Sequence, residues 1–185
     1  SDNISLTLGG GSFGVFNQSL NYKTNSKNVA TSVSLNNKKS VNNFNYLDNN
    51  IELERENADV NSLGINLSNS VRINQYQKIT TNIWYQNNDR GIPAGLGGVN
   101  KNERLVNEFL RSSIGWNRYG VKHDFSIKTA YFEEQLNYTN PIATIESISR
   151  FKTSITEAEF KKRLDNQGEI IVGSNLSHIQ AFTLN

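Results

Sequence analysis

The chain has 185 residues, a formal net charge of +2 and a mean hydropathy of -0.56. Hydrophobic residues make up 36% and charged residues only 19%, and about one residue in six is Asn, so the chain is polar without being highly charged. An aromatic content of 10% argues against a wholly disordered chain, and the scattered, nearly balanced charges argue against a nucleic-acid-binding stripe. The lack of Cys excludes disulfides, thiolate metal sites and Cys nucleophiles.

Alternation of apolar and polar residues dominates the chain and is typical of β-strands with one apolar face. In chain order, the segments with this pattern cover residues 4–8, 14–22, 29–36, 63–73, 79–86, 104–119, 121–131, 148–160 and 170–181. They predict about nine strands, and the longer ones reach roughly 9 to 16 residues where globular proteins usually have 5 or 6. One part of this pattern is ambiguous. Residues 156–164 fit a short helix, with Thr156 and Glu159 as a capping box, as well as they fit another long strand.

The connections between these strands are predicted to alternate in length. Short turns are expected at 23–28, 74–77 and 117–120, and long loops after Leu35, Gln86 and Leu136. An antiparallel meander through a membrane has this asymmetry, with tight turns on one side and long loops on the other.

Aromatic residues lie mainly toward the ends of the predicted strands, as in the girdles at membrane–water interfaces. They are Phe13, Phe16, Tyr22, Tyr76, Tyr85, Trp116, Tyr119, Tyr131 and Tyr138. The predicted fold class is therefore all-β, an antiparallel transmembrane β-barrel meander whose apolar face contacts lipid. A soluble β-sandwich is the alternative, but it uses shorter strands and more closely spaced turns.

We expect residues 1–185 to form one domain, about nine strands of a larger barrel. Because the chain contains no Met, even at position 1, we expect it to be a processed or excised piece of a longer protein.

Glycine and histidine motifs give no catalytic site. Gly9, Gly11 and Gly14 have the spacing of a dinucleotide-binding fingerprint, but a strand follows them instead of a helix, so they predict a tight hairpin. His123 and His178 do not lie at metal-ligand spacing from one another. No group of residues supports an enzymatic activity, and we expect none.

An acidic cluster lies in the first long loop, at Asp48, Glu52, Glu54 and Asp59. Its carboxylates offer the oxygen ligands that Ca²⁺ takes, six to eight per ion. The alternative interpretation is a solvated loop whose charges pair internally. Apart from Ca²⁺ at this cluster, we expect no cofactor.

The second long loop, residues 87–103, holds the ligand-binding candidates Asp89, Arg90, Gly95, Gly97 and Gly98. Arg90 suits a carboxylate or phosphate, and the glycines allow the backbone to approach a ligand closely. Long loops on rigid strands are where binding residues concentrate. The alternative is a loop that contacts nothing.

Two stretches of the chain resemble a known family. Residues 9–22, GGGSFGVFNQSLNY, resemble the first barrel hairpin of TonB-dependent outer-membrane receptors, and residues 87–98, NNDRGIPAGLGG, are similar to the entry of one of their extracellular loops. The resemblance implies a barrel of about 22 strands with a plugged lumen. It also implies energised uptake of a siderophore, haem or cobalamin across the outer membrane of a Gram-negative cell.

The same resemblance implies the partners of the chain. They are outer-membrane lipid, the receptor's own plug domain, TonB, and a small-molecule or metal-chelate ligand that meets the long loops, with no nucleic acid. Polar side chains of the lumen would hydrate the plug interface, among them Asn66, Arg72, Asn82, Arg111 and Lys128. The competing functions are a passive barrel, an adhesin and a soluble β-sandwich binding module.

Overall fold

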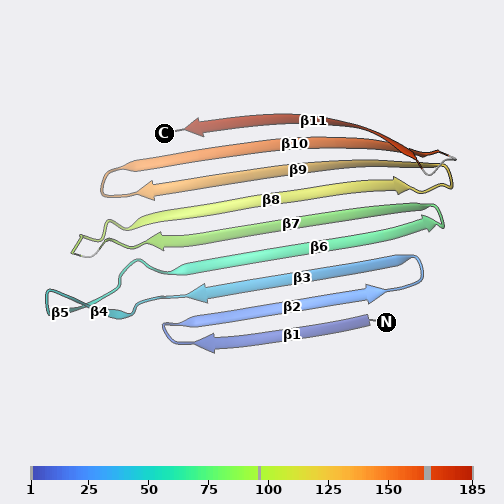
Figure 1. Ribbon diagram of the computed structural model, residues 1–185. Helices are drawn as coiled ribbons and strands as arrows, with labels where there is room; N and C mark the ends of the chain where they lie inside the picture. Colours follow the sequence, from blue (N-terminus) through green and yellow to red (C-terminus); the bar gives the residue numbers. More distant parts are fainter. Residues whose placement is uncertain (1, 96, 165–167, 185) are drawn as a thin grey trace.

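The fold is a single large antiparallel sheet with a small hairpin attached to it (Figure 1). In this computed structural model the described residues, 2–95, 97–164 and 168–184, form eleven β-strands. The strands are β1 (Asp2–Gly11), β2 (Val15–Asn25), β3 (Val29–Ser40), β4 (Asn45–Asp48), β5 (Ile51–Glu54), β6 (Val60–Asn74), β7 (Gln77–Ile92), β8 (Glu103–Arg118), β9 (His123–Asn140), β10 (Ile145–Arg163) and β11 (Glu169–Leu184). No helix among these residues is long and apolar enough to cross a membrane.

Nine strands follow one another across the main sheet in the order β1-β2-β3-β6-β7-β8-β9-β10-β11, and β4 pairs with β5 alone. The predicted all-β meander of about nine long strands is confirmed. The sheet is open, with β1 and β11 as its edge strands (Figure 1).

The ambiguous segment 156–164 is not a helix. Its residues up to Arg163 belong to β10, where Thr156 lies opposite Thr129 of β9 and Leu176 of β11. Backbone pairing on both sides satisfies more main-chain groups than a two-turn helix would, so the helical interpretation was wrong.

The two ends of the strands carry different connections. Connections 12–14, 41–59, 93–102 and 141–144 lie at one end, called here the loop edge and seen on the left of Figure 1. Connections 26–28, 75–76 and 119–122 lie at the other end, called the turn edge. Two of the expected long loops are present, at 41–59 and 93–102. The one expected after Leu136 is wrong, because β9 continues to Asn140 and a tight turn follows.

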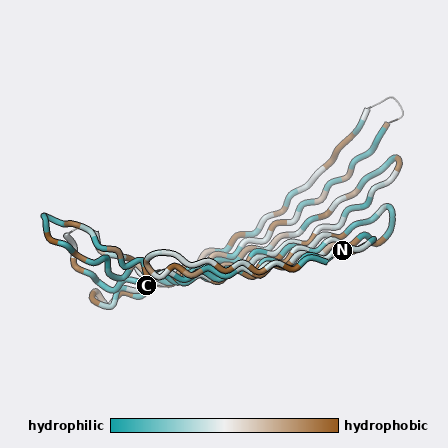
Figure 2. Tube along the Cα trace, turned by 90° about the horizontal axis from the view of Figure 1, so that it is seen from below, coloured by the Kyte–Doolittle hydropathy of each residue, from teal (hydrophilic) through white to brown (hydrophobic). Residues whose placement is uncertain are grey.

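One face of the sheet is concave and polar. Figure 2 shows that the sheet is curved, and two hollows of about 470 and 500 Å³ lie on the same face. They are lined mainly by small and polar side chains, among them Asn17, Asn36, Thr80, Ser126 and Lys128. Glycines at 64 and 115 also line them, and a Cβ at Gly115 would lie 3.0 Å from Oγ1 of Thr80. The lack of a side chain at Gly115 therefore relieves crowding on this face.

The opposite, convex face carries an apolar band that crosses the strands diagonally. Residues directly opposite one another share a face, and the row through Leu6 begins apolar and ends polar. It runs Leu6, Leu20, Leu35, Ile65, Tyr85, Leu110, Glu133, Lys152 and Gln180. On the later strands the apolar row lies nearer the turn edge, at Ile79, Trp116, Ile127 and Ala158. The band therefore drifts by about one residue per strand, the kind of stagger that tilted barrel strands require.

This single layer has almost no interior. Among the described residues Phe109 is the one buried hydrophobic side chain, at 9% exposure, whereas Ile4, Leu6 and Leu8 remain 62–71% exposed. The convex apolar side chains contact no second layer of described residues. A soluble β-sandwich, in which two apolar faces cover one another, is not what these residues form.

Candidate functional site

The two long connections lie against one another at the loop edge. The β4–β5 hairpin and loop 93–102 enclose a groove of about 240 Å³ lined by residues of both. Asn100 donates a hydrogen bond to Glu56 at 3.0 Å, which ties the loop to the segment after β5. Gly97 has a φ of +71°, and a Cβ there would lie 3.3 Å from a carboxylate oxygen of Asp48. Glycine at this position therefore permits both the left-handed backbone and the close approach of the hairpin.

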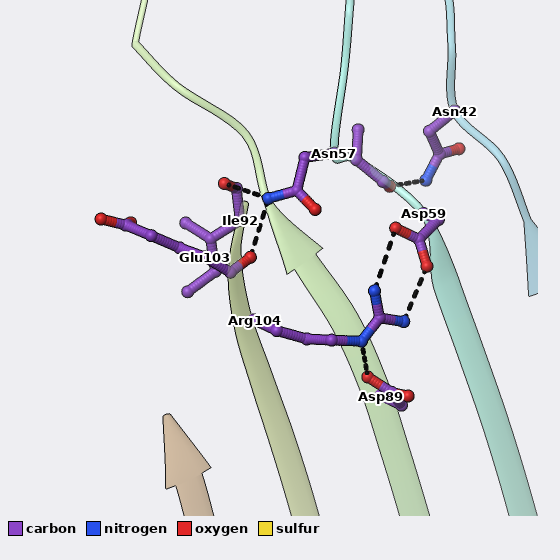
Figure 3. A network of polar contacts seen from close by, with 8 residues as sticks. Asn42, Asn57, Asp59, Asp89, Ile92, Glu103 and Arg104 are labelled. Carbon is purple, nitrogen blue, oxygen red and sulfur yellow. Dashed lines mark hydrogen bonds and ion pairs between the residues drawn. The ribbon is translucent and has the colours of Figure 1, made fainter. Parts of the chain in front are cut away.

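The base of these loops is held by two asparagines (Figure 3). Nδ2 of Asn57 donates to the carbonyl oxygens of Ile92 at 2.9 Å and Glu103 at 2.7 Å, which are the two ends of loop 93–102. Nδ2 of Asn42 donates to the carbonyl of Ala58 at 2.9 Å. Both asparagines have positive φ, 53° and 55°, a region that Asn tolerates better than most residues. One use of the high Asn content is thus to close this loop base.

An ion cluster lies beside these asparagines and joins three strands. Nη2 of Arg104 on β8 lies 2.8 Å from Oδ2 of Asp59, which precedes β6, and its Nε lies 2.5 Å from Oδ1 of Asp89 on β7 (Figure 3). Hydrogen bonds to Asp59 and then Asp89 raise the pKa of Arg104 above its usual value. Because these side chains are 33–41% exposed, each pair contributes roughly 0.2–1 kcal/mol. Together with the two asparagines they form what we call the loop-base clamp: Asn42, Asn57, Asp59, Asp89 and Arg104.

Two of the predicted ligand residues do not lie in a loop. Asp89 and Arg90 belong to β7, which continues to pair with β8 as far as Ile92 and Glu103. Asp89 is bound by Arg104 in the loop-base clamp. Arg90 lies opposite Val60 and faces the concave side. Their assignment to a loop was wrong, because β7 continues beyond Gln86 through five polar or glycine positions to Ile92.

The three predicted glycines do lie in loop 93–102. The amide of Gly98 donates to the carbonyl of Gly95 at 3.0 Å, which folds the loop into a turn. A Cβ at Gly95 would meet nothing within 4 Å, so this position is open. Their contact with a ligand remains a prediction.

The four candidate calcium ligands do not converge. Asp48, Glu52 and Glu54 lie on the β4–β5 hairpin, where Glu52 accepts a hydrogen bond from Asn45 and Glu54 one from Asn43. Asp59 is bound by Arg104 in the loop-base clamp. Across the described part of the chain no three acidic or histidine side chains are grouped as a metal site requires. Glu52 and Glu54 instead pair with asparagines of their own loop, and Asp59 pairs with an arginine of β8.

A cluster that the sequence analysis missed lies on the concave face. Arg111 lies 5.0 Å from the ring of Trp84 and 4.8 Å from that of Phe109, and the two rings meet edge to face at 4.9 Å. Trp84 and Phe109 are aromatic residues at positions where the alternation of β7 and β8 predicts polar ones. This departure from the alternation was the sequence signal that could have revealed the cluster. The predicted lumen residues share this face, since Asn66 and Arg111 lie opposite Trp84 and the hollows include Lys128.

Comparison with known proteins supports the architecture. No protein-family model and no curated protein sequence matches the chain. Its structure is similar to the crystal structure of the siderophore receptor PiuA from Acinetobacter baumannii, with a TM-score of 0.74 at 12% sequence identity. The match covers 99% of this chain and 31% of that receptor. At this identity the similarity establishes the fold, a nine-stranded antiparallel sheet like a segment of that receptor.

Proposed function

We propose that this chain forms part of the β-barrel of an outer-membrane receptor of a Gram-negative cell, which takes up a scarce, bulky ligand with energy delivered by TonB. The observation that carries the proposal is the diagonal apolar band on the convex face, backed by a polar concave face. Lipid contact on one side and a wet lumen on the other require this distribution. Tilted strands in turn require the band to cross the sheet obliquely.

The proposal places the ligand at the loop edge. The loop-base clamp fixes both ends of loop 93–102, while its glycines leave the tip adaptable, an arrangement suited to binding. The siderophore receptor PiuA provides one candidate ligand class, and haem and cobalamin are the others. The concave cluster of Trp84, Phe109 and Arg111 would face the receptor's plug domain or the passing ligand.

Labelling of intact cells tests this orientation. The chain has no Cys, so single cysteines introduced into it serve as probes. A membrane-impermeant maleimide should label Gly95→Cys on loop 93–102 from outside. It should label Asn28→Cys, in the turn at 26–28, only after the outer membrane is permeabilised. Equal labelling of both before permeabilisation would refute the orientation.

Uptake by the same cells tests the energy source. Accumulation of a labelled ferric siderophore, haem or cobalamin should require both this protein and TonB. Accumulation that persists without TonB would instead support a passive barrel.

A further inference from the structure

A groove of about 630 Å³ lies at the turn edge and opens on the convex face. It is formed by the ends of β7, β8, β9 and β10, and its lining includes Tyr76, Arg118, Tyr119, His123 and Phe160. The proposed ligand path runs through the loop edge and along the concave face. This groove lies away from both, so the proposed uptake gives it no role.

Side chains around the groove change from apolar to cationic over three successive rows. The first row is Ile79, Trp116 and Ile127, and the second is Gln77, Arg118, Phe125 and Phe160. The third row pairs His123 with Lys162 at the very end of β9 and β10. Each row lies two residues, or about 7 Å, nearer the strand end than the one before.

Aromatic contacts hold these rows together. The rings of Trp116 and Phe125 lie 5.5 Å apart, and the rings of His123 and Phe160 stack at 5.6 Å. Nε1 of Trp116 donates to the side-chain oxygen of Gln77 at 3.3 Å. The aromatic side chains of the groove are therefore held in place by one another, with Arg118 in the lining and Lys162 next to it, opposite His123.

Charges at this end of the sheet are sorted by face. On the concave side, Lys161 contacts Glu169 at 2.5 Å, and Arg163 binds Asp124. Asp124 also borders the groove. Its carboxylate accepts a further hydrogen bond, from the backbone amide of Gly120, at 3.0 Å.

The convex cations have different neighbours. Arg118 lies opposite Gln77 and Phe125, and Lys162 lies opposite His123 and Ile170. None of these directly opposite residues is acidic, so the groove margin attracts an anion.

We propose that this groove binds the phosphate of an anionic phospholipid from the membrane leaflet at the turn edge. The inference rests on the proposed function, which places the convex apolar band in lipid. A phosphate beside Arg118 would meet a planar guanidinium that matches its oxygens, with Lys162 as a second cation. The glycerol region would lie against Phe125 and Phe160, and the acyl chains along Trp116 and Ile127.

A lipid headgroup fits better than a free phosphate, because the groove continues without a break into the apolar band. Aromatic rings followed by cations are the arrangement that membrane–water interfaces select. A dissolved anion would gain nothing from the apolar first row or from the two phenylalanine rings of the second.

Quenching of Trp116 fluorescence by brominated lipid tests the proposal. The full-length protein is reconstituted into phosphatidylcholine vesicles that contain brominated phosphatidylglycerol or, in parallel, brominated phosphatidylcholine. The Trp116→Phe variant defines which part of the signal belongs to Trp116. We expect the phosphatidylglycerol probe, whose phosphate charge is not offset by a choline cation, to be preferred about fivefold for each cation that faces its headgroup.

Lys161 and Lys162 are adjacent on β10 but point to opposite faces of the sheet, so Lys161 provides a matched control. Arg118→Gln combined with Lys162→Gln should bring the preference close to one. Lys161→Gln, one position away but on the concave face, should leave it unchanged. Equal quenching by both probes in the unaltered protein, or an equal loss of preference in the double variant and in Lys161→Gln, would overturn the headgroup site while leaving the barrel proposal intact. If neither brominated lipid quenches Trp116, the proposed lipid-facing surface itself is refuted.

Discussion

Replacing Leu67 with Arg tests the proposed lipid-facing surface most directly. Leu67 lies in the middle of β6 on the convex face, opposite Val33 and Ile83. Near the bilayer midplane an Arg in place of this side chain should cost about 2–4 kcal/mol of folding free energy. Ser68 is the matched control, because it faces the concave side opposite Ser32 and Asn82. Ser68→Arg should therefore change the stability by no more than about 0.5 kcal/mol.

The cost should also depend on depth along β6. Leu63 and Val71 lie on the same face as Leu67, four residues to either side, which is about 13 Å along the strand. With strands tilted by about 40°, this corresponds to about 10 Å along the membrane normal, near the limits of an apolar band about 25 Å tall. Leu63→Arg and Val71→Arg should therefore cost only about 0–1 kcal/mol.

The assay is folding of the full-length protein into phospholipid vesicles. Urea titration, followed by the electrophoretic shift between folded and heat-denatured forms, gives the free energy for each variant. A peak at Leu67 with low values at both flanks is the expected profile. A flat profile, or equal losses for Leu67→Arg and Ser68→Arg, would refute the assignment of the convex face to lipid.

The open sheet edges, the loop base and the loop tip each give a further test. Expressed alone, residues 1–185 should aggregate or stay unfolded in detergent, because β1 and β11 would leave unpaired backbone groups in an apolar medium; a monodisperse, heat-modifiable monomer would contradict this. Gly91→Val should accelerate hydrogen exchange at the ends of loop 93–102, since a Cβ there would lie 2.5 Å from the carbonyl oxygen of Asn57; unchanged exchange would argue against a clamp at this point. In the intact protein, deletion of 94–99 should weaken ligand binding severalfold while the barrel still folds, because shortening a loop costs the scaffold little; calorimetry that finds equal affinity would remove this loop from the site.

The two-residue alternation of apolar and polar side chains was enough by itself to predict most of the strands. A strand with one face toward lipid or another apolar medium and the other toward water alternates in composition, as β6 does from Leu63 to Ile73. The capping-box motif at Thr156 is local and equally compatible with helix and strand. Its outcome depends on β9 and β11, which pair with β10 on both sides and lie far away in the sequence. No local pattern reports such partners.

The end of β7 shows where the same argument fails. Beyond Gln86 both faces of the strand carry polar residues, so the alternation disappears although backbone pairing with β8 continues to Ile92. Asp89 was therefore predicted to lie in a loop. Its ion-pair partner, Arg104, is 15 positions away, and the second carboxylate of the cluster, Asp59, is 45 positions from that arginine. Contacts at these separations depend on the register of three strands.

The arrangement of the sheet in chain order has a consequence for errors in assembly. Because each main strand pairs only with its neighbours in the sequence, the register of one hairpin sets the starting point for the next. A slip of one residue between β6 and β7 would turn every side chain of β7 to the other face, so that Trp84 would move to the convex face and Ile83 to the concave one. A slip of two residues would preserve the faces but displace the rest of the sheet by about 7 Å along the strands. The tight turn at 75–76, which joins β6 to β7, therefore helps to set the pairing register of all five main strands that follow it.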